Sequence, residues 1–112
     1  MRLGPQFYPT LALMAVWAAF RLPETIMNKD SREQPAMFAR QVSWWLMEEV
    51  CGWPHGLIAQ FAQRDRSAVS HGVQTVLERL ETDATLLDRV VKARVFFEKA
   101  LKDNEAGQEA AA

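Results

Sequence analysis

The chain of 112 residues has few of the features that mark a secreted, membrane or redox protein. Its one cysteine, Cys51, cannot form an internal disulfide, which fits a reducing compartment. The most apolar run, from Leu11 to Phe20, is about half the length that a membrane-spanning helix needs. No targeting signal is visible. We therefore expect a cytoplasmic protein with no membrane partner.

No excess of one charge is present either, because the formal net charge is −1. Nucleic-acid-binding proteins usually present a basic face, so any electrostatic contact with DNA has to come from a local patch. The hydrophobic content of 49% is ordinary for a globular protein. The length suits a single core. We predict one domain over residues 9–102, followed by a disordered Glu- and Ala-rich tail over 103–112.

The residues that could carry catalysis or bind a metal do not combine into a site. Cys51, His55 and His71 have mixed spacing across two predicted helices, which makes a poor zinc site. Cys51 also has no base at hand, because a Gly-Trp-Pro break separates it from His55. The adjacent acids Glu48 and Glu49 point in different directions on a helix. We therefore predict that the protein is not an enzyme and has no metal or cofactor.

Helical periodicity runs through the whole chain, without strand-like alternation, and so predicts an all-α fold built as a small helical bundle. Gly52 is placed to end one helix, and Asp65 is a good N-cap for another. Residues 1–8 are expected to be irregular, and residues 28–34 to form a polar loop. The predicted helices cover residues 9–20, 23–27 (a short turn), 35–51, 54–61, 66–80 and 82–102.

Each longer helix has one apolar arc that we expect to face the core. These inward residues are Leu13, Val16, Trp17, Phe20, Phe38, Ala39, Val42, Trp45, Leu46, Val50, Leu57, Ile58, Phe61, Val69, Val73, Val76 and Leu80. Trp44 falls outside its arc and either packs on the loop before Pro35 or contacts a partner. The last helix has surplus apolar residues, Val91, Val95 and Phe96. It either wraps across the bundle or forms a homodimer or partner interface.

A short helix, a tight corner and a second helix that starts with charged and hydroxyl residues follow one another between residues 54 and 80. The second helix places its polar residues opposite its apolar stripe; they are Ser67, His71, Gln74 and Glu78. A helix-turn-helix presents side chains to a DNA groove in this way. The same residues would otherwise form a solvated corner with a capping aspartate. We predict binding of double-stranded DNA.

A family resemblance rests on three groups of residues. They are Phe20-x-Leu22-Pro23-Glu24-x-Ile26-Met27-x-Lys29, Arg40-Gln41, and Phe61-x-x-Arg64-Asp65-x-Ser67-x-Val69-x-His71. Over roughly residues 10–80 the chain resembles the C-terminal DNA-binding domain of the bacterial replication initiator DnaA. The resemblance implies a helix-turn-helix of the DnaA C-terminal, Trp-repressor-like type.

The resemblance also implies DNA contacts for nine residues. The implied contacts are the minor groove for Arg40, base edges or phosphates for Arg64 and Asp65, the major groove for Arg66, Ser67, Ala68 and His71, and phosphates for Lys29 and Arg32. Arg40 has an alternative role, stacking on Trp44 one turn away.

Several departures from the family pattern affect the expected binding. Arg66 replaces a histidine and can bond to guanine O6 and N7, so the preferred DNA sequence should differ from that of the initiator. Glu48 stands where the family tends to have a basic residue that contacts phosphate. The acidic residues Asp30 and Glu33 lower the positive charge of the basic loop. Fewer phosphate contacts mean weaker, less salt-dependent binding, which suggests help from a dimer mate or a second protein. No Gly-x-x-x-x-Gly-Lys-Ser/Thr motif is present, so we do not expect a complete initiator.

Three functional hypotheses follow. The first is a bacterial, nucleoid-associated transcription regulator, an activator that works with a protein partner. The chain also resembles the DnaA-like half of activators of gene transfer agents, in which a sigma-factor-like protein, or one associated with RNA polymerase, completes the activator. The second hypothesis is a regulator of replication initiation that binds initiator-type sites. The third is a helical adaptor that binds only protein.

Overall fold

The computed structural model describes residues 2–22 and 34–111. Within these ranges the chain forms a 3-10 helix and five α-helices, and no strand, which confirms the all-α prediction. The predicted turn at 23–27, and Lys29 and Arg32 of the loop that follows it, lie outside the described residues. The elements are η1 (Pro5–Phe7), α1 (Tyr8–Phe20), α2 (Gln34–Cys51), α3 (His55–Ala62), α4 (Arg66–Thr82) and α5 (Ala84–Ala111).

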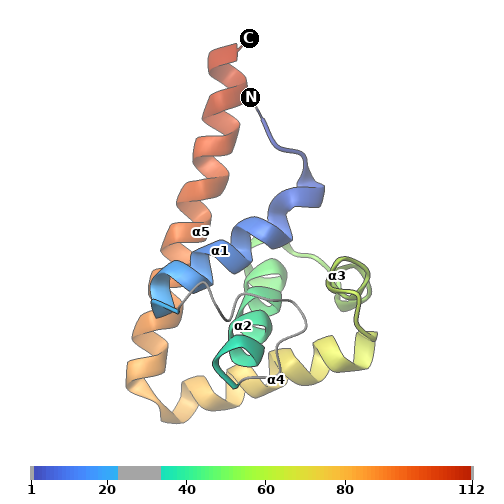
Figure 1. Ribbon diagram of the computed structural model, residues 1–112, viewed down its shortest axis with the longest axis vertical. Helices are drawn as coiled ribbons and strands as arrows, with labels where there is room; N and C mark the ends of the chain where they lie inside the picture. Colours follow the sequence, from blue (N-terminus) through green and yellow to red (C-terminus); the bar gives the residue numbers. More distant parts are fainter. Residues whose placement is uncertain (1, 23–33, 112) are drawn as a thin grey trace.

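Helix α2 occupies the middle of the bundle, and the other helices surround it (Figure 1). α1 packs against both α2 and α5. α4 packs against α2 as well, at the bottom of the view in Figure 1. α3 lies to one side, joined to α4 by a short corner. α5 extends beyond the other helices, and the N-terminal segment lies near its upper end. The corner and α4 are therefore at the periphery, where a partner can reach them.

The core draws apolar side chains from every α-helix, largely along the predicted arcs. Its fully buried members include Val16, Val42, Leu46, Met47, Ile58, Val69, Val76, Val90 and Phe97. Phe61 was wrongly predicted to face inward, since 43% of it is exposed. The two-turn helix α3 presents Ile58 and Ala59 to the core. Phe61, at its end, packs instead on Trp53, with ring centroids 5.2 Å apart.

Backbone conformations at the helix ends explain where the turns occur. α2 ends at Gly52, as predicted, with a left-handed φ of 70°. The Trp53 N–H donates to the Met47 carbonyl at 3.2 Å, and the Gly52 N–H donates to the Glu48 carbonyl at 3.0 Å. Such a cap satisfies carbonyls that a helix end leaves unpaired, and glycine adopts it without a Cβ penalty.

The N-terminal segment differs from the expected irregular lead, and α5 continues past residue 102. Residues 5–7 form η1, and α5 continues to Ala111. The Leu3 N–H donates to Asn104 Oδ1 at 2.7 Å, and Asn104 Nδ2 donates to the Leu3 carbonyl at 2.9 Å. This pair of bonds ties the helix beyond residue 102 to the N-terminal segment. The helical segment therefore extends further than the predicted domain boundary.

Helix α5 has both a buried and an exposed apolar side. Leu86, Val90, Ala93 and Phe97 belong to the core. The exposed large apolar residues of the helix are Leu87, Val91, Val95 and Phe96. The surplus expected from the sequence is therefore present on the surface, and α5 does not wrap far enough across the bundle to bury it. Across the described ranges, no helix combines the length and the apolar character that a membrane span requires.

Candidate nucleic-acid interface

The corner between α3 and α4 consists of Gln63, Arg64 and Asp65. Gln63 ends α3 in the left-handed region, with φ of 55°. The Arg64 N–H donates to the Ala59 carbonyl at 3.1 Å and so closes the end of α3. Asp65 is extended and occupies the N-cap position of α4. The chain therefore changes direction sharply within a few residues, as the helix-turn-helix interpretation predicted.

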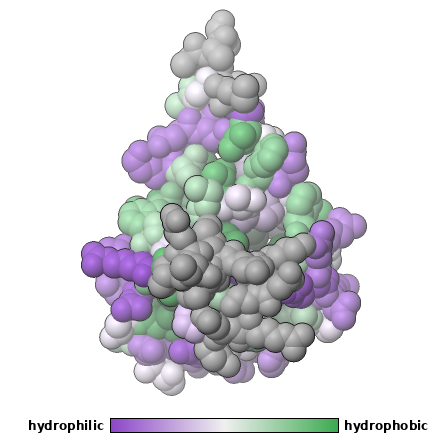
Figure 2. Space-filling model, viewed as in Figure 1, coloured by the Kyte–Doolittle hydropathy of each residue, from purple (hydrophilic) through white to green (hydrophobic). Residues whose placement is uncertain are grey.

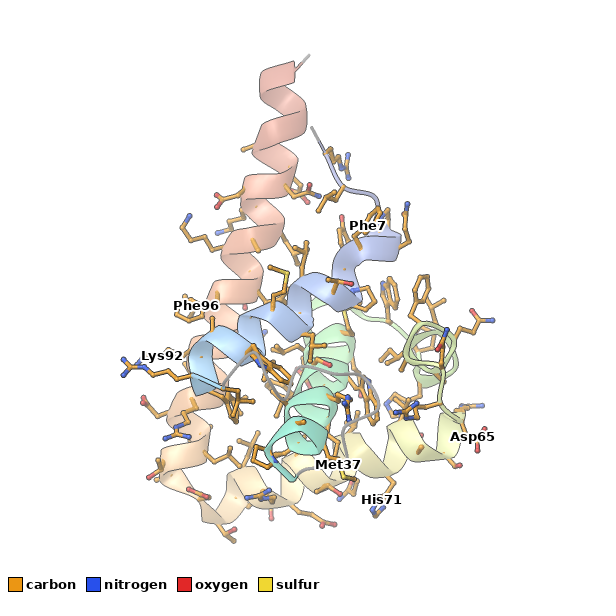
Figure 3. All side chains as sticks on the ribbon, viewed as in Figure 1. Phe7, Met37, Asp65, His71, Lys92 and Phe96 are labelled. Carbon is orange, nitrogen blue, oxygen red and sulfur yellow. The ribbon has the colours of Figure 1, made fainter. Side chains whose placement is uncertain are left out.

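Helix α4 presents a polar ridge on the side that faces away from the bundle. We use this name for the exposed residues Arg64, Asp65, Arg66, Ser67, Ala68 and His71. Val69 and Val73, on the opposite side of the helix, are buried and hold it in place. Asp65 and His71 point outward, away from α2 (Figure 3). The predicted DNA-facing residues of the corner and α4 thus lie together on one exposed surface.

Hydropathy distinguishes this region from the rest of the molecule. Mainly hydrophilic and neutral side chains line the lower edge of the space-filling view, where α4 lies (Figure 2). Hydrophobic side chains gather higher up, around α1 and α5. The edge formed by α4 therefore suits a polar partner better than an apolar one.

Arg40 reaches the same region from a different helix. It is half-buried on α2, and it lines, together with Gln63 and Arg64, a hollow of about 290 Å³. Trp44 and Phe61 form part of the apolar wall of this hollow. Two predicted DNA-binding arginines from separate parts of the chain are thus brought to one place. Their contacts with DNA, and the stacking of Arg40 on Trp44, stay predictions.

Sequence reasoning missed the residue that allows α4 to lie so close to α2. An ideal Cβ at Gly72 would be 2.8 Å from two ring carbons of Trp44 and 3.0 Å from Cγ of Gln41. Trp44 therefore packs on α4. The sequence predicted either packing on the loop before Pro35 or contact with a partner, and neither prediction included this contact with α4. A glycine inside a helical pattern often marks a close approach of this kind, and that signal was available in the sequence.

A polar cluster on the inner side of α4 was also missed. His55 Nε2 lies 2.7 Å from Glu48 Oε2, and His55 Nδ1 lies 2.7 Å from Ser70 Oγ. The three residues come from α3, α2 and α4 and are partly buried. Glu48 is therefore bonded to a neighbouring side chain, a contact that the sequence did not predict.

The predicted capping role of Asp65 is met in part. Asp65 stands at the N-cap with an extended backbone, but its side chain makes no capping hydrogen bond. Its carbonyl accepts the N–H groups of Ala68 at 3.0 Å and Val69 at 3.2 Å. The carboxylate is exposed at the edge of the polar ridge instead. Asp65 therefore starts the helix through its backbone and leaves its side chain available to a ligand.

The residues considered for metal binding do not meet in space. Among the described residues, no three His, Cys, Asp or Glu side chains are grouped so that they could hold a metal ion. Burial raises the pKa of the Cys51 thiol above its ordinary value. A thiol with a raised pKa is mostly protonated near neutral pH and is a poor nucleophile.

Comparison with known families agrees with this geometry. The family model described as the bacterial dnaA protein helix-turn-helix matches residues 11–76, which include most of α1, all of α2 and α3, and most of α4. The chain belongs to this family. A DnaA-type helix-turn-helix is a DNA-binding domain, and its corner is the segment that carries the polar ridge.

One curated relative is the chromosomal replication initiator protein DnaA of Deinococcus deserti. It is 29% identical to this chain over 94 residues, which cover 84% of this chain and 20% of the relative. The chain thus spans about a fifth of the length of the initiator that it matches. No solved structure matches the chain significantly.

Proposed function

We propose that the protein binds double-stranded DNA in a sequence-specific manner through the polar ridge. Arg66, Ser67, Ala68 and His71 enter the major groove, where arginine and hydroxyl side chains can bond to base edges. The observation that carries this proposal is that all four are exposed in the first turns of α4, directly after the corner. Arg40, beside Arg64, reaches the adjacent minor groove.

The direct test is a selection from random duplexes, followed by sequencing of the retained molecules and titration of the enriched site. We expect one enriched motif and binding that weakens as salt rises. A modest salt slope is expected, because few basic residues surround the ridge and the net charge is −1. No binding of duplex DNA at micromolar protein and low salt would contradict the proposal.

We further propose that the protein regulates transcription as an activator with a protein partner, in gene control of the gene-transfer-agent or phage type. Weak phosphate contacts favour a second binding component, since affinity gained from a partner can replace affinity lost at the phosphates. A sigma-factor-like protein, or one associated with RNA polymerase, would supply that component. Promoter-proximal binding sites and loss of transcription on deletion would support this role.

The exposed apolar side of α5 is the surface that we assign to this partner or to a second copy of the chain. Leu87, Val91, Val95 and Phe96 are 45%, 51%, 57% and 41% exposed on one helix. Phe96 and Lys92 leave α5 on the side away from α2 and α3 (Figure 3). A partner on this side would leave the polar ridge free to bind DNA.

Analytical ultracentrifugation over a range of protein concentrations distinguishes two uses of this surface. A homodimer would appear as self-association that rises with concentration, whereas a surface that binds another protein would leave the chain monomeric. Val95→Glu should abolish any self-association measured for the wild type, without unfolding the monomer. Thr85→Glu offers a matched control, because it adds the same charge to an exposed position of α5 outside this apolar side. A Val95→Glu protein that self-associates and activates transcription like the wild type would contradict this assignment.

A second candidate function is control of replication initiation. The relative that matches 84% of this chain is itself a chromosomal replication initiator, which favours this alternative. Comparing footprints distinguishes the two roles. Protection of initiator-type sites supports replication, and protection of an unrelated promoter-proximal motif supports transcription. A protein-only adaptor would bind neither kind of duplex.

A further inference from the structure

His55 connects the recognition helix to the centre of the bundle. It is the first residue of α3, and its two ring nitrogens bond to different helices. Nε2 lies 2.7 Å from Glu48 Oε2 of α2, and Nδ1 lies 2.7 Å from Ser70 Oγ of α4. Ser70 directly precedes His71 and follows Ser67 by one helical turn. The histidine is therefore attached to α4 within the turns that carry the polar ridge.

The chemistry of the partners determines how the neutral imidazole is arranged. An ionised carboxylate only accepts hydrogen bonds, so Nε2 must carry the hydrogen and donate it to Glu48. Nδ1 is then the acceptor, and the Ser70 hydroxyl donates to it. When the imidazole is protonated, Nδ1–H donates to Ser70 Oγ instead. Both protonation states satisfy every atom of the cluster, so a proton can be gained without breaking it.

We propose that His55 is a positioning residue for DNA recognition, and that DNA binding is accompanied by protonation of this histidine. This inference rests on the proposed DNA-binding function. With a neutral imidazole the Glu48–His55–Ser70 cluster carries one negative charge, and with a protonated imidazole it carries none. A duplex on the polar ridge brings phosphates close to this cluster, and charges within about 8–10 Å act on one another at ordinary salt. Protonation therefore favours binding.

The other charged and titratable groups around the cluster are few. α3 contains no other titratable residue. On α2, Glu49 is exposed next to Glu48, and Cys51 lies one turn further along. On α4, Arg66 precedes Ser70 by one turn on the same side, and His71 is exposed on the ridge. His71 is the only other histidine of the chain, so it is the residue whose titration has to be separated from that of His55.

The experiment measures the dissociation constant for the selected duplex by fluorescence anisotropy at fixed ionic strength. The pH range is about 6 to 8, because histidine changes charge there. The probes are the wild type, His55→Gln and His71→Gln, and the last of these shows how much of the pH dependence comes from the histidine of the polar ridge. We expect wild-type affinity to rise about three- to tenfold from pH 8 to pH 6, because the cluster loses its net negative charge when the imidazole is protonated. His55→Gln should remove most of this rise, because glutamine can bond to both partners but does not titrate.

Two further variants separate positioning from charge. Ser70→Ala should weaken binding at every pH, since α4 loses its bond to His55, and Ser70→Thr should restore it. Glu48→Gln should bind more tightly than the wild type at pH 8 and depend less on pH. Circular dichroism and urea unfolding confirm that each variant is folded.

Failure of this inference about His55 can be distinguished from failure of the proposed DNA-binding function. If the wild type binds no duplex, DNA binding itself is refuted, and this inference falls with it. If the wild type binds but His55→Gln keeps the full pH dependence, the protonation of His55 is refuted. If His55→Gln, Ser70→Ala and Glu48→Gln all bind like the wild type throughout, the cluster does not position α4.

Discussion

Gly72 of α4 lies directly against the indole ring of Trp44 on α2. A Cβ at this glycine would be only 2.8 Å from two ring carbons, closer than real Cβ contacts come. Gly72 and the neighbouring Val69 and Val73 are buried, whereas His71 is exposed. The contact therefore sets how near α4 lies to the core and which of its sides faces outward. The polar ridge depends on a residue that carries no side chain.

Gly72→Ala should destabilise the protein, because the added methyl group forces Trp44 or α4 to move. Overpacking of this kind costs about 1–3 kcal/mol, which exceeds the gain of about 0.4–1 kcal/mol that alanine gives at an unstrained helical site. Gly56→Ala is the matched control, since a Cβ there has nothing within 4 Å, and it should stabilise α3. Urea unfolding measures both changes. Equal effects of the two substitutions would contradict the steric account.

Arg66→Ala should weaken binding to the selected duplex by about 1–3 kcal/mol and relax the preference at one base position. The expected reason is loss of a bond from the guanidinium to a base edge. Lys99→Ala is a suitable control, because Lys99 is exposed on α5 and paired with Asp103 at 2.9 Å. A repeated selection measures the preference. An unchanged motif with uniformly lower affinity would make Arg66 a phosphate contact.

Asp83→Ala and Asp65→Ala should have different effects on stability, although both residues stand at helix N-caps. Asp83 Oδ1 accepts the Leu86 N–H at 3.0 Å, and loss of such a cap costs about 0.5–2 kcal/mol. Asp65 makes no capping side-chain bond, so its substitution should cost less than about 0.5 kcal/mol. Unfolding curves give both values. A larger loss for Asp65→Ala would show that its carboxylate caps α4 in solution.

Cys51 should react slowly with iodoacetamide in the folded protein. Burial raises the pKa of its thiol, and the thiolate is the reactive form. The labelling rate at about pH 8 should therefore rise several-fold when the protein is unfolded in urea. Because the folded pKa lies above the unfolded one, the linked stability is present below the unfolded pKa and is lost as pH rises toward the folded pKa. Equal labelling rates in the two states would contradict this placement of Cys51.

Local signals predicted the course of the chain well. Pro9, Gly52 and Asp65 mark helix starts and ends where the structure has them, because caps and proline act through the backbone of their own segment. The apolar stripe of α4 at Val69, Val73 and Val76 is buried, since its spacing leaves only one side of a helix for the core. The outward direction of Ser67 and His71 followed from the same spacing.

Contacts between helices could not be predicted in this way. Phe61 is apolar and at helical spacing, yet it is 43% exposed and packs on Trp53, which lies outside its own helix. The bonds of His55 join residues 7 and 15 positions away, across three helices. These bonds cross helix boundaries, whereas periodicity carries information only within one helix.

Periodicity and capping thus determined which segments are helical, which side of each is apolar, and that charged and hydroxyl residues follow the corner after Phe61. The tertiary structure alone decided how α4 is held. Its closeness to α2 depends on the missing side chain of Gly72, and its bond to α3 depends on where Ser70 meets His55. Helix formation depends on neighbours within one or two turns, whereas the angle of a recognition helix depends on side chains that meet only after the bundle has formed.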